Sequence, residues 1–180
     1  MRLHLVRHPR PVATDGLCYG SSEVAAIVDD RLLAQLLAVL PHAVPLYTSP
    51  LKRCLNLAAA LAPALDSGPP IGDPRLAEMH FGTWEMQPWS DIPRVEVDAW
   101  AADLIHYRPG GGESVLQVAQ RLQAFRNEMA AKEGEAVVIC HAGTVRLLSA
   151  PQMGLEELAL SAARKAHAIA YGSVTVVDVQ

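Results

Sequence analysis

Residues 136–146 read AVVICHAGTVR, and residues 3–9 read LHLVRHP. Each segment is a short apolar run that ends at a histidine, His141 in one and His8 in the other. The β-branched run over 136–140 is typical of a strand that is covered on both faces, as strands of parallel sheets are. Open α/β sheets place their ligands at the ends of such strands. The two segments therefore predict a buried sheet with a site at one edge.

A leucine-rich helix is predicted between these two strands. The leucines of 32–40 recur at helical spacing, which gives the helix one apolar face. Asp29 and Asp30 can cap its start, and Pro41 is expected to stop it. The apolar face is expected to pack on the sheet.

A second strand and helix are predicted over 44–65. Residues 44–47 favour the strand, and Ser49 as N-cap with Pro50 at the first helical position favours the helix. Arg53 lies on a different side of this helix from the apolar stripe, so we expect it to face a site. The stripe itself is expected to contain Leu51, Cys54, Leu55, Ala58, Leu61 and Leu65.

The C-terminal part of the chain continues the alternation of helix and strand. Ser114 and Gln117 form a capping box at the start of a helix with one apolar face. Two closing strands are expected at 169–171 and 174–179, joined at Gly172. The alternation predicts an α/β fold, a three-layer α/β/α sandwich with a mostly parallel central sheet.

Residues 66–112 lack this regularity and contain all three tryptophans. We expect a single domain over 1–180 in which this segment is an excursion over the active site. Trp84, Trp89 and Trp100 could form an aromatic wall for a nucleobase-like leaving group. Clustered tryptophans more often fill a small satellite core, and that interpretation is preferred. The triple glycine at 110–112 lacks the lysine of a P-loop and is expected to act as a hinge.

Composition and net charge bear on the partners and the location to be expected for this protein. The chain has 180 residues, a net charge of −4 and no run of Lys or Arg, so nucleic acid and anionic membranes are not expected partners. Its three cysteines are far apart and form no CxxC pair, which favours a reducing cytoplasm and no structural metal. No apolar run approaches the length of a membrane span. The oligomeric state stays open, with a homodimer as one option.

Four cationic or imidazole side chains are predicted to meet at the sheet edge: Arg7, His8, Arg53 and His141. Guanidinium groups bind phosphoryl oxygens with two donors, and a neutral imidazole is a competent nucleophile toward phosphorus. Positive charge beside His8 would lower its pKa and keep the lone pair available. Taken alone, His8 is more often a structural histidine and Arg53 a solvated one, so the pattern as a whole carries the prediction.

Five segments in order strengthen that pattern: LVRHP at 5–9, TSPLKRC at 48–54, DPRLAEMHFGTWE at 73–85, PGGGES at 109–114 and VVICHAGTVR at 137–146. Together they resemble the histidine phosphatase (phosphoglycerate mutase-like) superfamily over nearly the whole chain. The resemblance implies a phosphoglycerate mutase-like fold and a phosphatase that needs no cofactor or metal. Its substrate would be a small phosphomonoester.

The resemblance also implies roles for individual residues. It implies His8 as the phosphorylated nucleophile, Glu78 as the proton donor to the leaving oxygen, and Arg7, Arg53, His141 and Thr14 as phosphate-binding residues. Glu85 and Glu113 lie close to Glu78 in sequence and stay alternatives to it. In the implied mechanism the phosphoryl group passes to His8 and then to water, with the glutamate as general acid and then general base.

The sequence departs from the family pattern at three positions. Pro9 stands where a glycine usually follows the catalytic histidine, so that amide donor is lost. Thr14 stands where the family often has asparagine, and Met86 where a glycine is common. None of the three changes removes the predicted nucleophile.

Two further segments, RHPRPV at 7–12 and GLCYGSSEVA at 16–25, resemble the alpha-ribazole phosphatase branch of the family. That branch dephosphorylates a nucleotide-loop intermediate of cobalamin synthesis. Alternatives are a broad-specificity or sugar-phosphate phosphatase and a non-catalytic phosphoanion-binding protein. A phosphoglycerate mutase is less favoured, because the chain leaves little room for the insertions that enclose a mutase site.

Overall fold

The centre of the fold is a five-stranded sheet with the strand order β4-β3-β6-β1-β7. The computed structural model describes residues 1–164 and 168–180. Neighbouring strands are parallel except for β7, which runs antiparallel to β1. The strands are β1 (Arg2–Arg7), β3 (Leu46–Thr48), β4 (Ile71–Gly72), β6 (Glu135–Cys140) and β7 (Val174–Asp178). The predicted, mostly parallel sheet is therefore confirmed.

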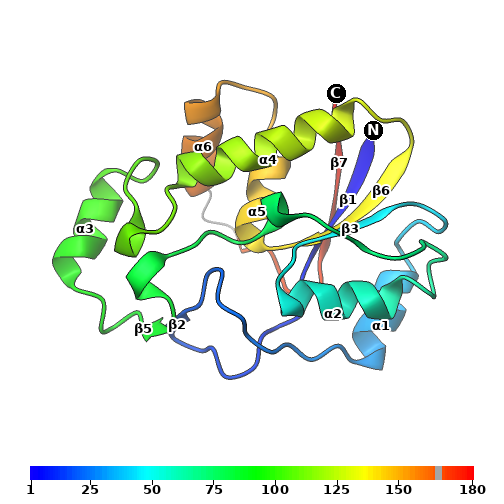
Figure 1. Cartoon of the computed structure of the whole chain (residues 1–180), viewed down its shortest axis with the longest axis horizontal. Coiled ribbons are helices and arrows are strands. Elements are labelled where there is room, and N and C mark those ends of the chain that lie inside the picture. The colour runs from blue at the N-terminus through cyan, green and yellow to red at the C-terminus, as the bar shows by residue number, and fades with distance from the viewer. Residues whose placement is uncertain (165–167) are drawn as a thin grey trace.

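Helices cover both faces of this sheet (Figure 1). One face carries α1 (Asp30–Leu37) and α2 (Lys52–Leu61), and the other carries α4 (Val115–Ala130), α5 (Ala142–Leu148) and α6 (Leu155–Arg164). Because side chains alternate along β6, Val137 and Ile139 enter the core beneath α2, whereas Val138 enters the core beneath α4. This is the expected three-layer α/β/α sandwich.

Strand register brings the predicted site residues to one edge. Arg7 of β1 lies opposite Cys140 of β6, so His8 and His141 leave the sheet side by side. The His8 amide donates to the Cys140 carbonyl at 3.0 Å. The Ser49 amide, just beyond β3, donates to the Ile139 carbonyl at 2.9 Å, which adds a third chain crossing to the same edge.

Two predicted helix starts are confirmed. The Asp29 carboxylate caps α1 by accepting a hydrogen bond from the Leu32 amide at 2.8 Å. Ser114 and Gln117 form the expected capping box at the start of α4. The end of α1 is less well predicted, because the helix stops at Leu37 rather than running on to Pro41.

The start of α2 differs from the prediction. The helix begins at Lys52 with Leu51 as N-cap, although the Ser49 hydroxyl accepts a hydrogen bond from the Leu51 amide at 3.3 Å and also lies 2.7 Å from Nε2 of His141. Leu55 is exposed and Leu57 is buried in its place. Residues 169–171 were expected to form a strand, but they form no strand and lead into a turn before β7.

Residues 66–112 first supply β4 to the edge of the sheet and then extend away from it, with more regular structure than predicted. Beyond β4 they hold α3 (Arg94–Ala102), three 3-10 turns, namely η1 (Pro74–Leu76), η2 (Gly82–Trp84) and η3 (Pro109–Gly111), and β5 (Gln87–Pro88). β5 pairs with β2 (Leu17–Cys18) beside α3, at the end of the molecule away from α1 (Figure 1).

The triple glycine forms a packing contact rather than a hinge. A Cβ atom on Gly112 would lie 2.1 Å from the His80 carbonyl oxygen, and one on Gly82 would lie 2.0 Å from the Gly110 carbonyl oxygen. Only residues without side chains allow these backbones to approach so closely. The contact joins η2 to η3 and fixes the segment that carries Phe81.

Candidate active site

His8 is buried at the end of β1, with only 2% of its surface exposed. Its Nδ1 atom lies 2.7 Å from the Pro9 carbonyl oxygen. Because a carbonyl oxygen can only accept, Nδ1 must carry the proton, which leaves the lone pair on Nε2. The proline that departs from the family pattern thus supplies the acceptor that orients this ring.

The environment keeps the His8 ring neutral. Burial lowers its pKa to about 3, and the hydrogen bond to Pro9 opposes part of this effect. The positive charges of Arg53 and Arg7 lower the pKa further. A neutral imidazole retains the lone pair that attack on phosphorus requires.

His141 lies against His8, with the two ring centroids 5.0 Å apart. It is completely buried, and its pKa is far below the ordinary value because of burial and because of the charge of Arg53. Its Nε2 atom lies 2.7 Å from the Ser49 hydroxyl. The two histidines therefore share one buried site, although 133 positions separate them in the chain.

Arg53 is also completely buried, although it was expected to lie apart from the apolar stripe of α2 and to face a site. Its guanidinium group donates to the carbonyl oxygens of Gly20 at 2.6 Å and Ser22 at 2.7 Å. Arg7 donates to the carbonyl oxygen of Ile169, and its guanidinium carbon lies 3.6 Å from the centre of the Tyr171 ring. Both cations are fixed in position by the protein itself.

Three buried nitrogen atoms around His8 have no hydrogen-bond partner among the described residues: Nε of Arg7, Nε of Arg53 and Nδ1 of His141. Buried donors without partners carry a free-energy penalty. Arg7 lines an open cavity beside His8, whereas Arg53 and His141 are completely enclosed and do not line it. The cluster therefore places one guanidinium group where it can bind a phosphoryl oxygen, and it surrounds the His8 ring with further positive charge.

Two tyrosines that the sequence analysis did not identify flank these residues. The hydroxyl groups of Tyr19 and Tyr171 lie 3.0 Å apart, and the Tyr171 ring lies 5.6 Å from the His8 ring. Burial raises the pKa of Tyr19 to about 12, so its hydroxyl stays protonated. Tyr19 lies in the 16–25 segment that resembled the family branch, whereas Tyr171 lay in a predicted strand and gave no separate signal.

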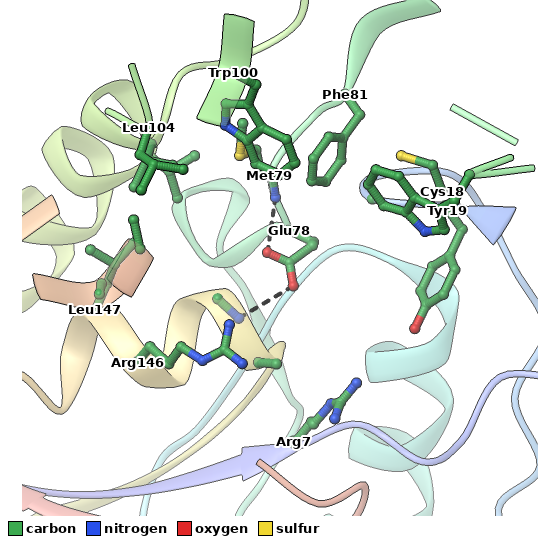
Figure 2. A pocket seen from close by; sticks show the side chains of 18 of the residues that line it. Arg7, Cys18, Tyr19, Glu78, Met79, Phe81, Trp100, Leu104, Arg146 and Leu147 are labelled. Atoms are coloured by element: carbon green, nitrogen blue, oxygen red, sulfur yellow. Dashed lines mark hydrogen bonds between the residues drawn. The ribbon is translucent and has the colours of Figure 1, made fainter. Parts of the chain in front are cut away.

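A cavity of about 400 Å³ opens beside this cluster. Arg7, His8, Glu78 and Arg146 line one end of it, and apolar and aromatic side chains line the other. Figure 2 shows Arg7, Glu78 and Arg146 facing one another, with Phe81 and Trp100 beyond Glu78. Arg146 belongs to the 137–146 segment, but no role had been assigned to it.

Glu78 is the carboxylate, of the three considered, that lines the cavity. One of its oxygens accepts a hydrogen bond from the Met79 amide at 3.0 Å, and the other accepts one from the Gly143 amide at 3.4 Å (Figure 2). These contacts hold the carboxylate at the N-terminus of α5, next to His141. From there it can exchange a proton with a bound ester.

The two alternative glutamates have structural contacts instead. Glu113 forms an ion pair with Arg121, at 2.9 and 3.1 Å, and accepts a hydrogen bond from the His80 amide. Burial would raise the pKa of Glu85, but hydrogen bonds from Phe81 and from the serines at 21–22 together lower it. Glu85 therefore anchors the loop whose carbonyl oxygens bind Arg53. Neither glutamate lines the cavity.

The geometry supports some of the remaining predictions for single residues and not others. Thr14 is buried and does not line the cavity, so its predicted phosphate contact has no support from the geometry. Trp84 is a core residue, as preferred, and donates to Glu96 at 2.7 Å. Trp89 and Trp100, however, line the cavity, so the core interpretation is wrong for Trp89 and incomplete for Trp100.

Within residues 1–164 and 168–180, no three His, Cys, Asp or Glu side chains are grouped so that they could hold a metal ion. The helices formed by these same residues are too short or too polar to span a bilayer. All three cysteines are buried free thiols.

Comparison with known proteins agrees with the geometry of the site. The profile of the histidine phosphatase superfamily (branch 1) matches residues 3–180. The chain is 30% identical over 165 residues to the adenosylcobalamin/alpha-ribazole phosphatase of Escherichia coli (strain K12), covering 86% of this chain and 80% of that protein. A metal-independent phosphoserine phosphatase of Arabidopsis thaliana is 31% identical over 122 residues, 64% of this chain and 51% of that protein.

A solved structure also resembles this chain over its whole length. The crystal structure of the alpha-ribazole phosphatase from Shigella flexneri superposes with a TM-score of 0.79 at 26% identity. The superposition covers all of this chain and 91% of the other. The likeness therefore includes the sheet, the helices on both of its faces and the 66–112 segment.

Proposed function

The chain belongs to the histidine phosphatase superfamily, and we propose that it hydrolyses its phosphomonoester through a phosphohistidine intermediate on His8. Its relatives are phosphatases, and the chain is a phosphatase by the same relationship. The observation that supports the intermediate is the buried, neutral His8 ring, whose Nδ1–H donates a hydrogen bond to the Pro9 carbonyl. The lone pair of Nε2 is therefore the one that can attack phosphorus.

In the first step, Nε2 of His8 attacks phosphorus and the bond from phosphorus to the leaving oxygen breaks. Glu78, protonated at this stage, gives its proton to that oxygen, so the product leaves as a neutral alcohol. The phosphorylated ring keeps its proton on Nδ1, where the Pro9 carbonyl accepts it. The hydrogen bond therefore stabilises the positive charge that develops on the ring.

In the second step, water attacks phosphorus and the phosphorus–nitrogen bond breaks. Glu78, now a carboxylate, takes a proton from the attacking water and returns to its starting state. The electron pair of the broken bond returns to Nε2, so His8 is again neutral. Inorganic phosphate then leaves, and the site is ready for another substrate.

Arg7, Arg53 and His141 are proposed to hold the phosphoryl oxygens through both steps. Support comes from the position of Arg7 beside His8 in the cavity lining, and from the nearness of the Arg53 charge and the His141 ring to His8. Removal of one such donor is expected to lower kcat by about a hundredfold to a thousandfold. We assign no phosphate contact to Thr14.

The proposed substrate is alpha-ribazole 5′-phosphate. The Escherichia coli relative and the Shigella flexneri structure both carry the name alpha-ribazole phosphatase, and the chain covers most of each. The phosphoserine phosphatase is matched over only about half of its length. Nothing in these relatives favours a sugar-phosphate phosphatase, a mutase or a phosphoanion sensor.

Two organisational features complete the proposal. The chain is one domain, and residues 66–112 form an excursion over the active site, as the lining of the cavity by Phe81, Trp89 and Trp100 supports. A cytoplasmic location is supported by the three free thiols.

A direct test compares wild type with His8→Ala on a panel of phosphomonoesters that includes alpha-ribazole 5′-phosphate and phosphoserine. Wild type is expected to release inorganic phosphate fastest from alpha-ribazole 5′-phosphate, and the variant is expected to release none above background. Equal turnover by the two proteins would overturn the proposal.

A further inference from the structure

We propose that Phe81, Trp89 and Trp100 form a subsite for a planar aromatic base carried by the leaving group. This inference rests on the proposed function, because it takes the end of the cavity at His8 as the phosphate site. It adds the residues that choose the leaving group. The ligand class is a phosphorylated nucleoside with a bicyclic base.

The three rings have an ordered arrangement. The planes of Trp89 and Trp100 are nearly parallel, at 9°, with their centroids 6.5 Å apart. Phe81 is nearly perpendicular to both, with its centroid 6.0 Å from Trp89 and 5.9 Å from Trp100. Ring faces and edges are thus both presented along one stretch of the cavity, and planar aromatic ligands bind through both kinds of contact.

Charge divides the cavity into two parts. The charged side chains that line it, Arg7, Glu78 and Arg146, lie together in Figure 2, and His8 directly follows Arg7 in the lining. The residues that line the remainder carry no charge. A small charged alcohol such as serine would leave the aromatic surface in contact with water, whereas an aromatic base would bury it. Charge and shape together therefore favour a leaving group with an apolar, planar end.

Two tryptophans of the proposed subsite differ from a core residue in their exposure or in the hydrogen bonding of their indole N–H. Trp89 is 42% exposed, although it is a large aromatic side chain. The indole N–H of Trp100 is buried and has no partner among the residues that the structure describes. In contrast, Trp84 is buried and its indole N–H is bound to Glu96. A heteroaromatic ligand would cover the exposed surface of Trp89.

The wall is fixed before any ligand binds. The Phe81 amide donates to Glu85 at 2.9 Å, and the Trp89 amide donates to the Gly16 carbonyl at 2.9 Å. The close contact of Gly82 with Gly110 holds the chain directly after Phe81. Because these rings are already in place, binding costs little conformational entropy. Most of the free energy of the ring contacts is therefore available for affinity.

The test measures kcat/KM for alpha-ribazole 5′-phosphate and for phosphoserine with wild type, Trp89→Ala, Trp89→Phe and Val95→Ala. Stacking of a base on one aromatic side chain predicts that Trp89→Ala lowers the ratio of the two values about tenfold. Trp89→Phe should keep most of the ratio. Val95 is 75% exposed on α3 and does not line the cavity, so Val95→Ala is the matched control and should leave the ratio unchanged.

An unchanged ratio in Trp89→Ala would overturn the inference while leaving the phosphatase intact. If wild type hydrolysed neither ester, the proposed function would fail, and the subsite would then be tested with the dephosphorylated nucleoside alone. Binding of alpha-ribazole to wild type, followed by tryptophan fluorescence or calorimetry, should weaken about tenfold in Trp89→Ala. Absence of binding, or equal binding by both proteins, would contradict the subsite.

Discussion

At the scale of single residues, the backbone carbonyl of Pro9 orients the predicted nucleophile. It accepts a hydrogen bond from Nδ1–H of His8, which any residue at this position could do, whereas the amide donor that proline lacks is not replaced. The contact fixes which nitrogen can act as nucleophile. A sequence can show that the donor is lost, but it cannot show where the carbonyl points, because that depends on the chain path after β1.

His8 is predicted to stay neutral through the physiological pH range. Its pKa is lowered to about 3, so the neutral form persists as the pH falls below the ordinary histidine value and is lost only near the lowered one. The ring should be the Nδ1–H tautomer throughout. Nitrogen-detected NMR of labelled protein between pH 8 and pH 4.5 checks this, and a titration of His8 near pH 6.5 would refute it.

Substitution of Glu78 is predicted to affect catalysis, whereas substitution of Glu113 is predicted to affect stability. Glu78→Gln should lower kcat by about a hundredfold or more with little loss of stability, because Glu78 faces the cavity. Glu113→Gln should weaken the ion pair with Arg121, cost about 1 kcal/mol of stability, and keep kcat within roughly tenfold. Steady-state kinetics and thermal denaturation of both variants make the comparison. The reverse pattern would assign the proton donor to Glu113.

Met86 occupies a backbone conformation that favours glycine, with φ at 64°. This explains why the family commonly has glycine where this chain has methionine. The Met86 side chain is 47% exposed, so little packing is lost on its removal. Met86→Gly is therefore expected to raise the unfolding free energy by about 0.5 kcal/mol, the relief of strain exceeding the added chain entropy. Chemical denaturation measures this, and a clear loss of stability would contradict it.

At the scale of secondary-structure elements, the sequence predicts those that bury a regular apolar face. The strands β1 and β6 were predicted from short continuous apolar runs, and the helix α4 from apolar residues at helical spacing. In contrast, α3 was missed because none of its residues is buried, so it has no apolar stripe to detect. The start of α2 lies at Lys52 rather than at Pro50, and the Ser49 hydroxyl contacts His141 as well as the Leu51 amide, a tertiary contact that local sequence cannot reveal.

The contact between η2 and η3 gives a prediction for one glycine. Gly112→Ala would bring a Cβ atom to 2.1 Å from the His80 carbonyl, so we expect a loss of roughly 1–3 kcal/mol of stability. Gly72→Ala is the matched control, since nothing lies within 4 Å of a Cβ there. Thermal melts of the two variants compare them. Equal melting temperatures would show that the segment yields to the added methyl group.

At the scale of the whole molecule, the sheet assembles a site from three distant segments. The ends of β1, β3 and β6 bring Arg7, His8, Ser49 and His141 to one edge, and α2 contributes Arg53. Convergence at this edge could be predicted, because parallel strands end on the same side. The enclosure of Arg53 by the carbonyl oxygens of residues 20–22 could not, since that loop has no periodic pattern. The cavity wall likewise depends on how residues 66–112 fold back.

The most direct test of the account is to trap the phosphoenzyme. Wild type mixed with a phosphomonoester and quenched in alkali, which preserves phosphohistidine, should yield a phosphorylated peptide that contains His8 when digested and analysed by mass spectrometry. His8→Asn should yield no phosphorylated peptide and no released phosphate. Phosphate on another residue, or turnover by His8→Asn at the wild-type rate, would contradict the account.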